Sequence, residues 1–205
     1  MKMIFVLGCL LALGSVAVVG APIGPVCPTC QGGVYNLTFS KVSIGGEVDI
    51  FNLFLLIDTT LYTGGGSYVH AVAPKVSNLL TAFTLLSAPG GTSGWETFDG
   101  GLHADGCSGA GAGFLCTQST GLGAPLTNPI NQWGWRITLP HDSLFTGAGQ
   151  ASIKVLFVDG EGNKVGDLVS ESTTLSQIPE PIPLLLLGSG LVGLGLFSRR
   201  RRRVV

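Results

Sequence analysis

A Cys-x-x-Cys motif lies near the start of the chain, where Cys27 and Cys30 flank Pro28 and Thr29. A redox-active motif of this spacing needs a strand before it and a helix after it, and a zinc site needs two further ligands. Here a glycine pair follows, no second Cys-x-x-Cys exists, and Gln31 stands where c-type haem attachment needs His. We therefore expect a disulfide or an unstructured leader, with redox or metal chemistry as the alternative.

A second cysteine pair, Cys107 and Cys116, brackets the glycine-rich segment 109–113. A bridge between them would close a short flexible loop, which suits an oxidising compartment. If Cys9 is removed with a signal peptide, the four remaining cysteines allow three pairings. We favour one bridge within each of the two pairs.

Asp99, His103 and Asp105 lie within seven residues of one another, in a glycine-rich region. Such residues could bind a metal ion or transfer protons, but nothing nearby completes a set. We interpret them as solvated loop residues, and we predict no catalytic residue, no metal site and no cofactor. The alternative is a secreted hydrolase with its site between Asp99 and Asp105. Convergence of these side chains with Trp95 or Trp133 in one cleft would favour it.

Trp133 and Trp135 are two residues apart, so in a strand they share one face, while Arg136 points to the other. On an exposed face the two indoles would form a flat platform for sugar rings. On an inner face they are core residues, which is the commoner role of large aromatic side chains. Both interpretations stay open on the sequence alone.

Short runs with strand-like alternation make up most of the chain between residues 34 and 174. Tyr35, Leu37 and Phe39 alternate with polar residues, as in a half-buried strand. Segment 100–131 is poor in this pattern and is expected to be a long loop. The spacing predicts an all-β exported domain over 22–177, a β-sandwich or jelly roll. The other expected strands are 48–57, 67–73, 80–87, 133–139, 152–158 and 164–174.

The segment Asp159 to Asn163 is expected to turn the chain between the last two of these strands. Asp159, Glu161 and Asn163 also imitate the first ligands of an EF-hand loop. Lys164 stands where that loop needs glycine, and no flanking helices are predicted. A hairpin turn is the simpler interpretation, with loose calcium binding as the alternative.

The charges of the chain are segregated. Only 11% of residues are charged, against about 25% in typical proteins. Between residues 22 and 180 there are five basic and twelve acidic residues, a balance of −7, although the whole chain carries only −1. A domain of that sign gains nothing from contact with phosphates, so nucleic acid is excluded as a partner.

Both ends of the chain have the composition of targeting segments. Residues 1–21 begin with a lysine and continue with an apolar run and small residues, which predicts a secretory signal peptide. Near the other end, the uncharged run 182–197 would form a helix about 24 Å long, close to the thickness of a hydrocarbon core. The basic residues after it would stay in the cytoplasm and leave the preceding domain outside. They are Arg199, Arg200, Arg201, Arg202 and Arg203.

Residues 178–205 resemble the PEP-CTERM sorting signal, which also carries an ice-binding label. The resemblance rests on Pro179, Glu180 and Pro181, the apolar helix over 182–198 and the arginine cluster over 199–203, in that order. It implies recognition of the motif by exosortase, a membrane transpeptidase of Gram-negative bacteria, and a link to exopolysaccharide and biofilm.

The sequence therefore predicts an exported, non-enzymatic protein, held first in the inner membrane and then at the cell surface or in the matrix. We expect it to be structural or to bind polysaccharide. Besides the hydrolase, the alternative is a single-span surface protein whose tail is never cut.

Overall fold

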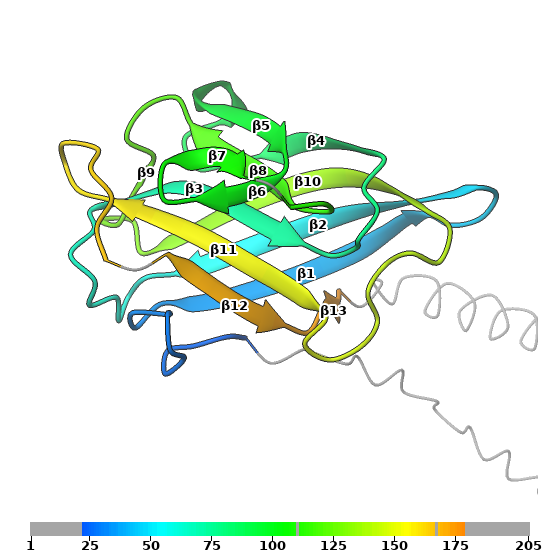
Figure 1. Cartoon of the computed structure of the whole chain (residues 1–205), viewed down its shortest axis with the longest axis horizontal. Helices are drawn as coiled ribbons and strands as arrows, with labels where there is room; N and C mark the ends of the chain where they lie inside the picture. The colour runs from blue at the N-terminus through cyan, green and yellow to red at the C-terminus, as the bar shows by residue number, and fades with distance from the viewer. Residues whose placement is uncertain (1–21, 110, 167, 179–205) are drawn as a thin grey trace, which may run out of the picture.

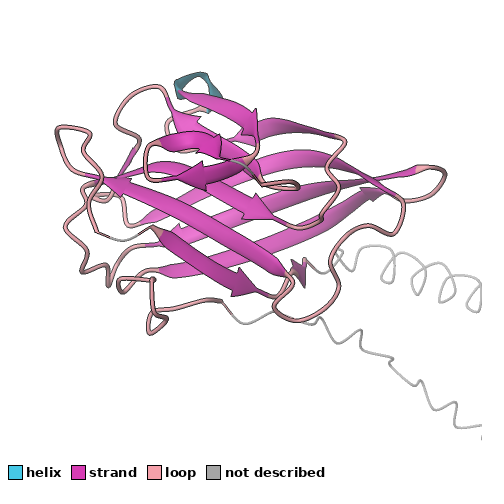
Figure 2. Ribbon diagram, viewed as in Figure 1, coloured by secondary structure: helices cyan, strands magenta, loops and turns pink. Residues whose placement is uncertain are grey.

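Two main β-sheets carry the fold of this protein (Figures 1 and 2). The computed structural model describes residues 22–178, apart from 110 and 167. Among these residues, helical structure is limited to one 3-10 turn, Thr92–Gly94. The predicted all-β class is therefore confirmed.

The first sheet has five strands in the order β13–β1–β2–β10–β4. Strands β1 and β2 form an antiparallel hairpin, and β10 runs antiparallel to β2 along its whole length. Strand β13 lies parallel to β1 at one edge. The strands are β1 (Val34–Ser43), β2 (Val48–Asp58), β4 (Ala82–Ser87), β10 (Ile130–Pro140) and β13 (Ser176–Gln177).

The second sheet has the order β12–β11–β3–β8–β5, with β9 also paired to β3. Strands β11 and β12 form the antiparallel hairpin that the sequence predicts around the turn at 159–163. The strands are β3 (Tyr68–Lys75), β5 (Trp95–Asp99), β8 (Leu115–Ser119), β9 (Ala124–Pro125), β11 (Ala151–Val158) and β12 (Val169–Thr173).

The main core lies between the two sheets. Tyr35, Leu37 and Phe39 are buried in β1 as their alternation predicts, because successive side chains of a strand point to opposite faces. In strand β2, buried side chains likewise alternate with more exposed ones. One continuous cluster of buried side chains joins both sheets, for example Leu53 from β2 and Phe157 from β11. This is the packing of a β-sandwich.

A small hairpin covers the outer side of the second sheet. It consists of β6 (Gly101–His103) and β7 (Gly106–Gly109) (Figure 1). Its Leu102 and Cys107 pack against a second buried cluster, formed with Ala71, Ala73, Cys116 and Leu156.

The prediction of a long loop over 100–131 is wrong, because this segment contains β6, β7, β8 and β9. These strands are only two to five residues long, and β6 and β7 are rich in glycine. Runs of that length and composition show no clear alternation of apolar and polar residues.

Both ends of the described chain attach to the outer edge of β1. Ile23 and Tyr35 exchange two backbone hydrogen bonds, each 2.8 Å long. At the other end of the strand, Ser176 of β13 lies opposite Thr38, and the Ile178 N–H donates to the Phe39 carbonyl at 2.8 Å. These contacts cover a strand edge that would otherwise be open to pairing with another chain.

The predicted signal peptide (1–21) and the three parts of the predicted sorting tail (179–181, 182–198 and 199–203) lie outside the described residues. Within residues 22–178, apart from 110 and 167, no helix has the length and apolar character needed to cross a membrane.

Candidate functional site

Trp133 and Trp135 belong to the core. They lie on the same face of β10, as predicted, but that face is the inner one, and both side chains have 0% exposure. The Trp133 ring packs edge-to-face on Trp95, with 5.3 Å between ring centroids. The indole N–H of Trp135 donates to the Thr117 hydroxyl on the opposite sheet at 2.9 Å. The platform interpretation of Trp133 and Trp135 is therefore wrong, since no ligand can reach buried rings.

Asp99, His103 and Asp105 do not converge. All three are exposed, and they lie at the end of β5, in β6 and in the β6–β7 turn. Asp99 lines a shallow cleft of about 330 Å³ together with Leu80, Thr81, Ala82, Phe83 and Thr97. His103 and Asp105 do not line this cleft. The buried Trp95 and Trp133 do not line it either, so the arrangement that would favour a hydrolase is not found among the described residues.

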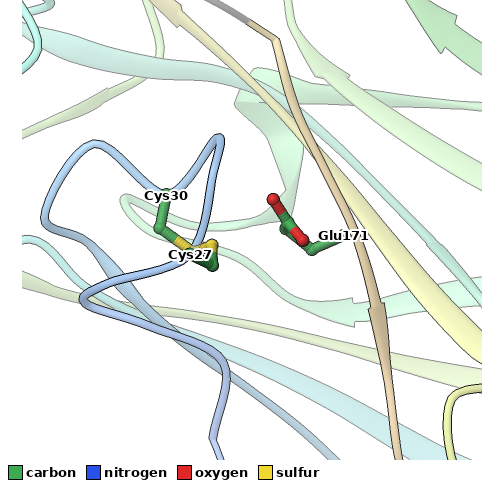
Figure 3. A group of neighbouring side chains, drawn as sticks. All are labelled: Cys27, Cys30 and Glu171. Atoms are coloured by element: carbon green, nitrogen blue, oxygen red, sulfur yellow. A yellow bond between two sulfur atoms is a disulfide. The ribbon is translucent and has the colours of Figure 1, made fainter.

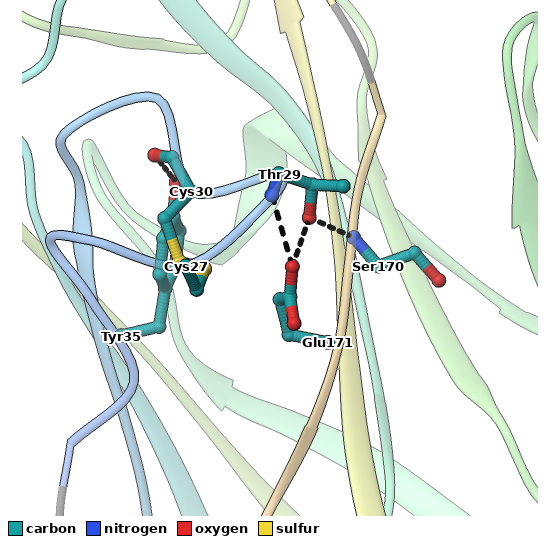
Figure 4. Close-up of a disulfide and its surroundings, with 6 residues drawn as sticks. All are labelled: Cys27, Thr29, Cys30, Tyr35, Ser170 and Glu171. Carbon is teal, nitrogen blue, oxygen red and sulfur yellow. Dashed lines mark hydrogen bonds between the residues drawn. A yellow bond between two sulfur atoms is a disulfide. The ribbon is translucent and has the colours of Figure 1, made fainter.

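The Cys27–Cys30 disulfide is present, with its two Cα atoms 5.2 Å apart, and it lies beside Glu171 of β12 (Figure 3). Thr29, between the cysteines, donates to Glu171 Oε1 from its backbone N–H at 3.0 Å and from its hydroxyl at 2.6 Å. The Thr29 hydroxyl also accepts the Ser170 N–H at 3.0 Å (Figure 4). The motif thus fastens the N-terminal segment to the edge of the second sheet.

In the oxidised protein, the group of Cys27, Cys30 and Glu171 has a structural role. Cys27, Cys30 and Glu171 have ligand atoms within 4.8 Å of one another, but disulfide sulfurs carry no thiolate to bind a metal. Cys30 is fully buried, and its carbonyl accepts the Tyr35 hydroxyl at 3.2 Å. Burial is the main cause that raises the pKa of Tyr35 far above its usual value, so this phenol stays protonated.

The Cys107–Cys116 disulfide is also present, with 5.6 Å between its Cα atoms. It joins β7 to β8 and so holds the covering hairpin on the second sheet. Both predicted cysteine pairings are confirmed. Each bridge sits at a point where a segment with few apolar side chains packs on a sheet.

The structure brings together a second titratable group, Asp49, His141 and Asp142, which sequence reasoning missed. The nearly buried Asp49 Oδ1 lies 3.0 Å from His141 Nδ1, and His141 Nε2 lies 3.4 Å from Asp142 Oδ2. Asp49 also accepts the backbone N–H groups of Gly45 and Asp142, both at 3.1 Å. The group therefore ties the β1–β2 turn to the end of β10. No short motif could reveal it, because Asp49 is 92 residues from His141 and 93 from Asp142.

A cluster of two lysines around one aromatic ring lies on the outer face of the second sheet. We call it the Lys75–Lys154–Phe114 cluster. The ammonium groups lie 5.4 Å (Lys75) and 4.9 Å (Lys154) from the centroid of the Phe114 ring. These are cation–π distances. All three side chains are half-buried. No local sequence pattern predicts this cluster, since its members lie on three separate segments.

The turn at Asp159–Asn163 is confirmed as a hairpin turn. Asp159 Oδ1 accepts the backbone N–H groups of Glu161 and Asn163 at 3.0 and 2.8 Å, and Oδ2 accepts the Asn163 side-chain amide at 3.2 Å. The Asn163 backbone bond is the main cause that lowers the pKa of Asp159. The Asp159 carboxylate therefore accepts hydrogen bonds from the turn itself and stabilises it.

Comparison with known proteins does not assign this chain to a family. No family model and no curated protein matches the chain. Similar solved structures include a GH20 exo β-N-acetylglucosaminidase from Vibrio harveyi, with 12% identity over 72% of this chain and a TM-score of 0.33. Another is the C-terminal domain of the AgI/II polypeptide BspA from Streptococcus agalactiae, with 17% identity over 70% of this chain and a TM-score of 0.34. The chain spans 19% of the first structure and 50% of the second. At these identities and scores the similarities carry no argument about function.

Proposed function

We propose that this chain is an exported β-sandwich protein that exosortase sorts through its Pro-Glu-Pro tail. In this proposal it is held first in the inner membrane and then acts at the cell surface or in the extracellular matrix. There it serves as a structural or polysaccharide-binding module and catalyses no reaction. Residues 22–177 form its exported domain.

The observation that carries the proposal is a pair of disulfides in an all-β domain. Disulfides form and persist outside the cytoplasm, and a protein with such bridges needs a route of export. The N-terminal pattern and the ordered tail of Pro179-Glu180-Pro181, apolar run and arginine cluster would supply that route and its end point. Within the described chain, the acid–base side chains that the sequence singled out do not gather in one cleft, which favours binding over catalysis.

Intact-mass analysis of the protein from the envelope and medium of its native host tests this proposal. Thiols are alkylated before and after reduction, so that the mass also counts paired cysteines. We expect a species that lacks the signal peptide and the arginine cluster and that gains alkyl groups only after reduction. A Glu180→Ala variant should keep its tail and accumulate in the membrane, whereas Glu161→Ala, at an exposed turn residue outside the motif, should still be cut.

A wild-type protein that keeps Arg199–Arg203 in both fractions would overturn the sorting proposal. It would leave a single-span surface protein. Cysteines alkylated without reduction would argue against export itself.

A further inference from the structure

We propose that the Lys75–Lys154–Phe114 cluster is a binding site for an acidic polysaccharide, whose carboxylates lie between the two ammonium groups. This rests on the proposed function and deepens it, because it names the chemical class of the polysaccharide and the surface that binds it.

The cluster is built by the strand register of the second sheet. Lys75 of β3 lies opposite Ser152 of β11 and forms a β-bridge with Phe114 on its other side. Lys154 follows two residues after Ser152 and therefore points to the same face. It is thus a diagonal neighbour of Lys75, and such pairs have Cα atoms about 7–8 Å apart. The register therefore brings both ammonium groups close to the same ring.

The two positive charges are not neutralised within the described chain. The ion pairs found there all involve His141, and neither lysine lies within 4.0 Å of a described carboxylate. Two like charges held near one ring repel each other, and an anion between them would turn that repulsion into attraction. The cluster also gathers two of the five basic residues between positions 22 and 180, where acidic residues are in excess by seven. A polyanion is repelled by most of this domain and attracted here.

The surroundings of the cluster favour a saccharide over an acidic peptide. Ser152, Ser170 and Ser172 lie beside the lysines, because Ser170 pairs with Lys154 and Ser172 with Ser152. Their hydroxyl groups can donate and accept hydrogen bonds, as a ligand rich in hydroxyl groups requires. The lysines stand on the face of the sheet, in β3 and β11, whose backbones are already paired on both sides. At Lys75 and Lys154 themselves, a peptide strand therefore finds no free backbone edge.

Binding of polygalacturonate to the processed, disulfide-bonded protein tests the inference. Dextran serves as the neutral polysaccharide and polyglutamate as the acidic peptide. We expect polygalacturonate to bind, with an affinity that falls as salt is added. The Lys75→Ala/Lys154→Ala variant should bind about tenfold more weakly or worse. Lys41→Ala/Lys164→Ala removes the same charge from exposed positions outside the cluster and should bind nearly as the wild type does. Lys75→Arg/Lys154→Arg should retain binding. Circular dichroism and thermal unfolding verify that each variant is folded.

Equal loss of polygalacturonate binding in both double-alanine variants would overturn the site, because net charge alone would then explain the binding. Polyglutamate that binds as tightly and depends on the same lysines would overturn the choice of a saccharide. If dextran binds and polygalacturonate does not, the polysaccharide-binding function stands while this site is wrong. If no polysaccharide binds, both the site and that function are wrong.

Discussion

The His141–Asp49 pair shows how two side chains far apart in the sequence stabilise one end of the sandwich. The hydrogen bond that His141 donates to the Asp49 carboxylate is the main cause that raises the pKa of His141, and Asp142 adds to it. The same bond is the main cause that lowers the pKa of Asp49. A raised histidine pKa gives stability that is complete below about pH 6.5 and is lost as the pH rises through the folded value. A lowered aspartate pKa gives stability that is complete above about pH 4 and is lost on acidification through the folded value.

We therefore predict that His141→Ala lowers the free energy of unfolding more at about pH 5.5 than at about pH 8.5. At the acid value the wild-type histidine is charged and paired, and at the alkaline value it carries less of that charge. Urea unfolding at the two pH values measures the difference. His103→Ala is the matched control, because this histidine is exposed and its side chain has no hydrogen bond or ion pair to another described residue. A destabilisation by His141→Ala that is the same at both pH values would contradict the prediction.

At the scale of the strands, a buried hydrogen bond connects the two sheets. The Trp135 indole of β10 donates to the Thr117 hydroxyl of β8, and both residues have 0% exposure. We predict that Thr117→Val destabilises the protein by about 1–3 kcal/mol, because it leaves a buried indole N–H without a partner. Chemical denaturation measures this cost.

A double-mutant cycle with Trp135→Phe isolates that bond. Once Trp135 is phenylalanine, Thr117→Val should cost less, with a coupling of about 0.5 kcal/mol or more. The neighbouring Trp133 supplies the control, since its buried indole N–H has no hydrogen-bond partner in the described chain. The cycle of Trp133→Phe with Thr117→Val should be additive within about 0.5 kcal/mol. If the Trp135 cycle is additive as well, the hydrogen bond from Trp135 to Thr117 contributes nothing to the free energy of unfolding.

For the whole molecule, the structure divides into a large core and a smaller layer with its own buried cluster. Only Leu102 and Cys107 of the covering hairpin enter that second cluster, so the Cys107–Cys116 bridge is its main attachment. We predict that Cys107→Ala/Cys116→Ala lowers the local stability of the covering hairpin, residues 101–109, by about 2–3 kcal/mol. Limited proteolysis should then cut within this segment first. The sandwich between the sheets should remain folded, as judged by near-ultraviolet circular dichroism of its buried tryptophans. Unfolding of the whole domain at the same denaturant concentration as the hairpin would contradict this division.

The long strands could be predicted from the sequence, and the contacts between them could not. Alternation marks β1 and β2 because half of their side chains enter one large core. Strands β6 and β7 could not be predicted from alternation, because they contribute only two side chains, Leu102 and Cys107, to a small cluster. The alternation in β10 places Trp133 and Trp135 together but does not say which face is covered, since that depends on the opposite sheet. The contacts of His141 and of Lys75 depend on register between distant segments, which no local pattern carries.

The attachment of both ends of the described segment, at Ile23 and Ile178, to β1 has a mechanical consequence. If the segments before residue 22 and after residue 178 are both tethered, tension is first resisted by the backbone bonds of Ile23 and Ile178 along one edge of that strand. These few bonds are at the periphery, so they should part before the long β1–β2 hairpin separates. The Cys27–Cys30 bridge then limits how far the N-terminal segment extends, and Thr29 on Glu171 holds it to β12. The edge of β1 would act as a short extensible link that spares the core.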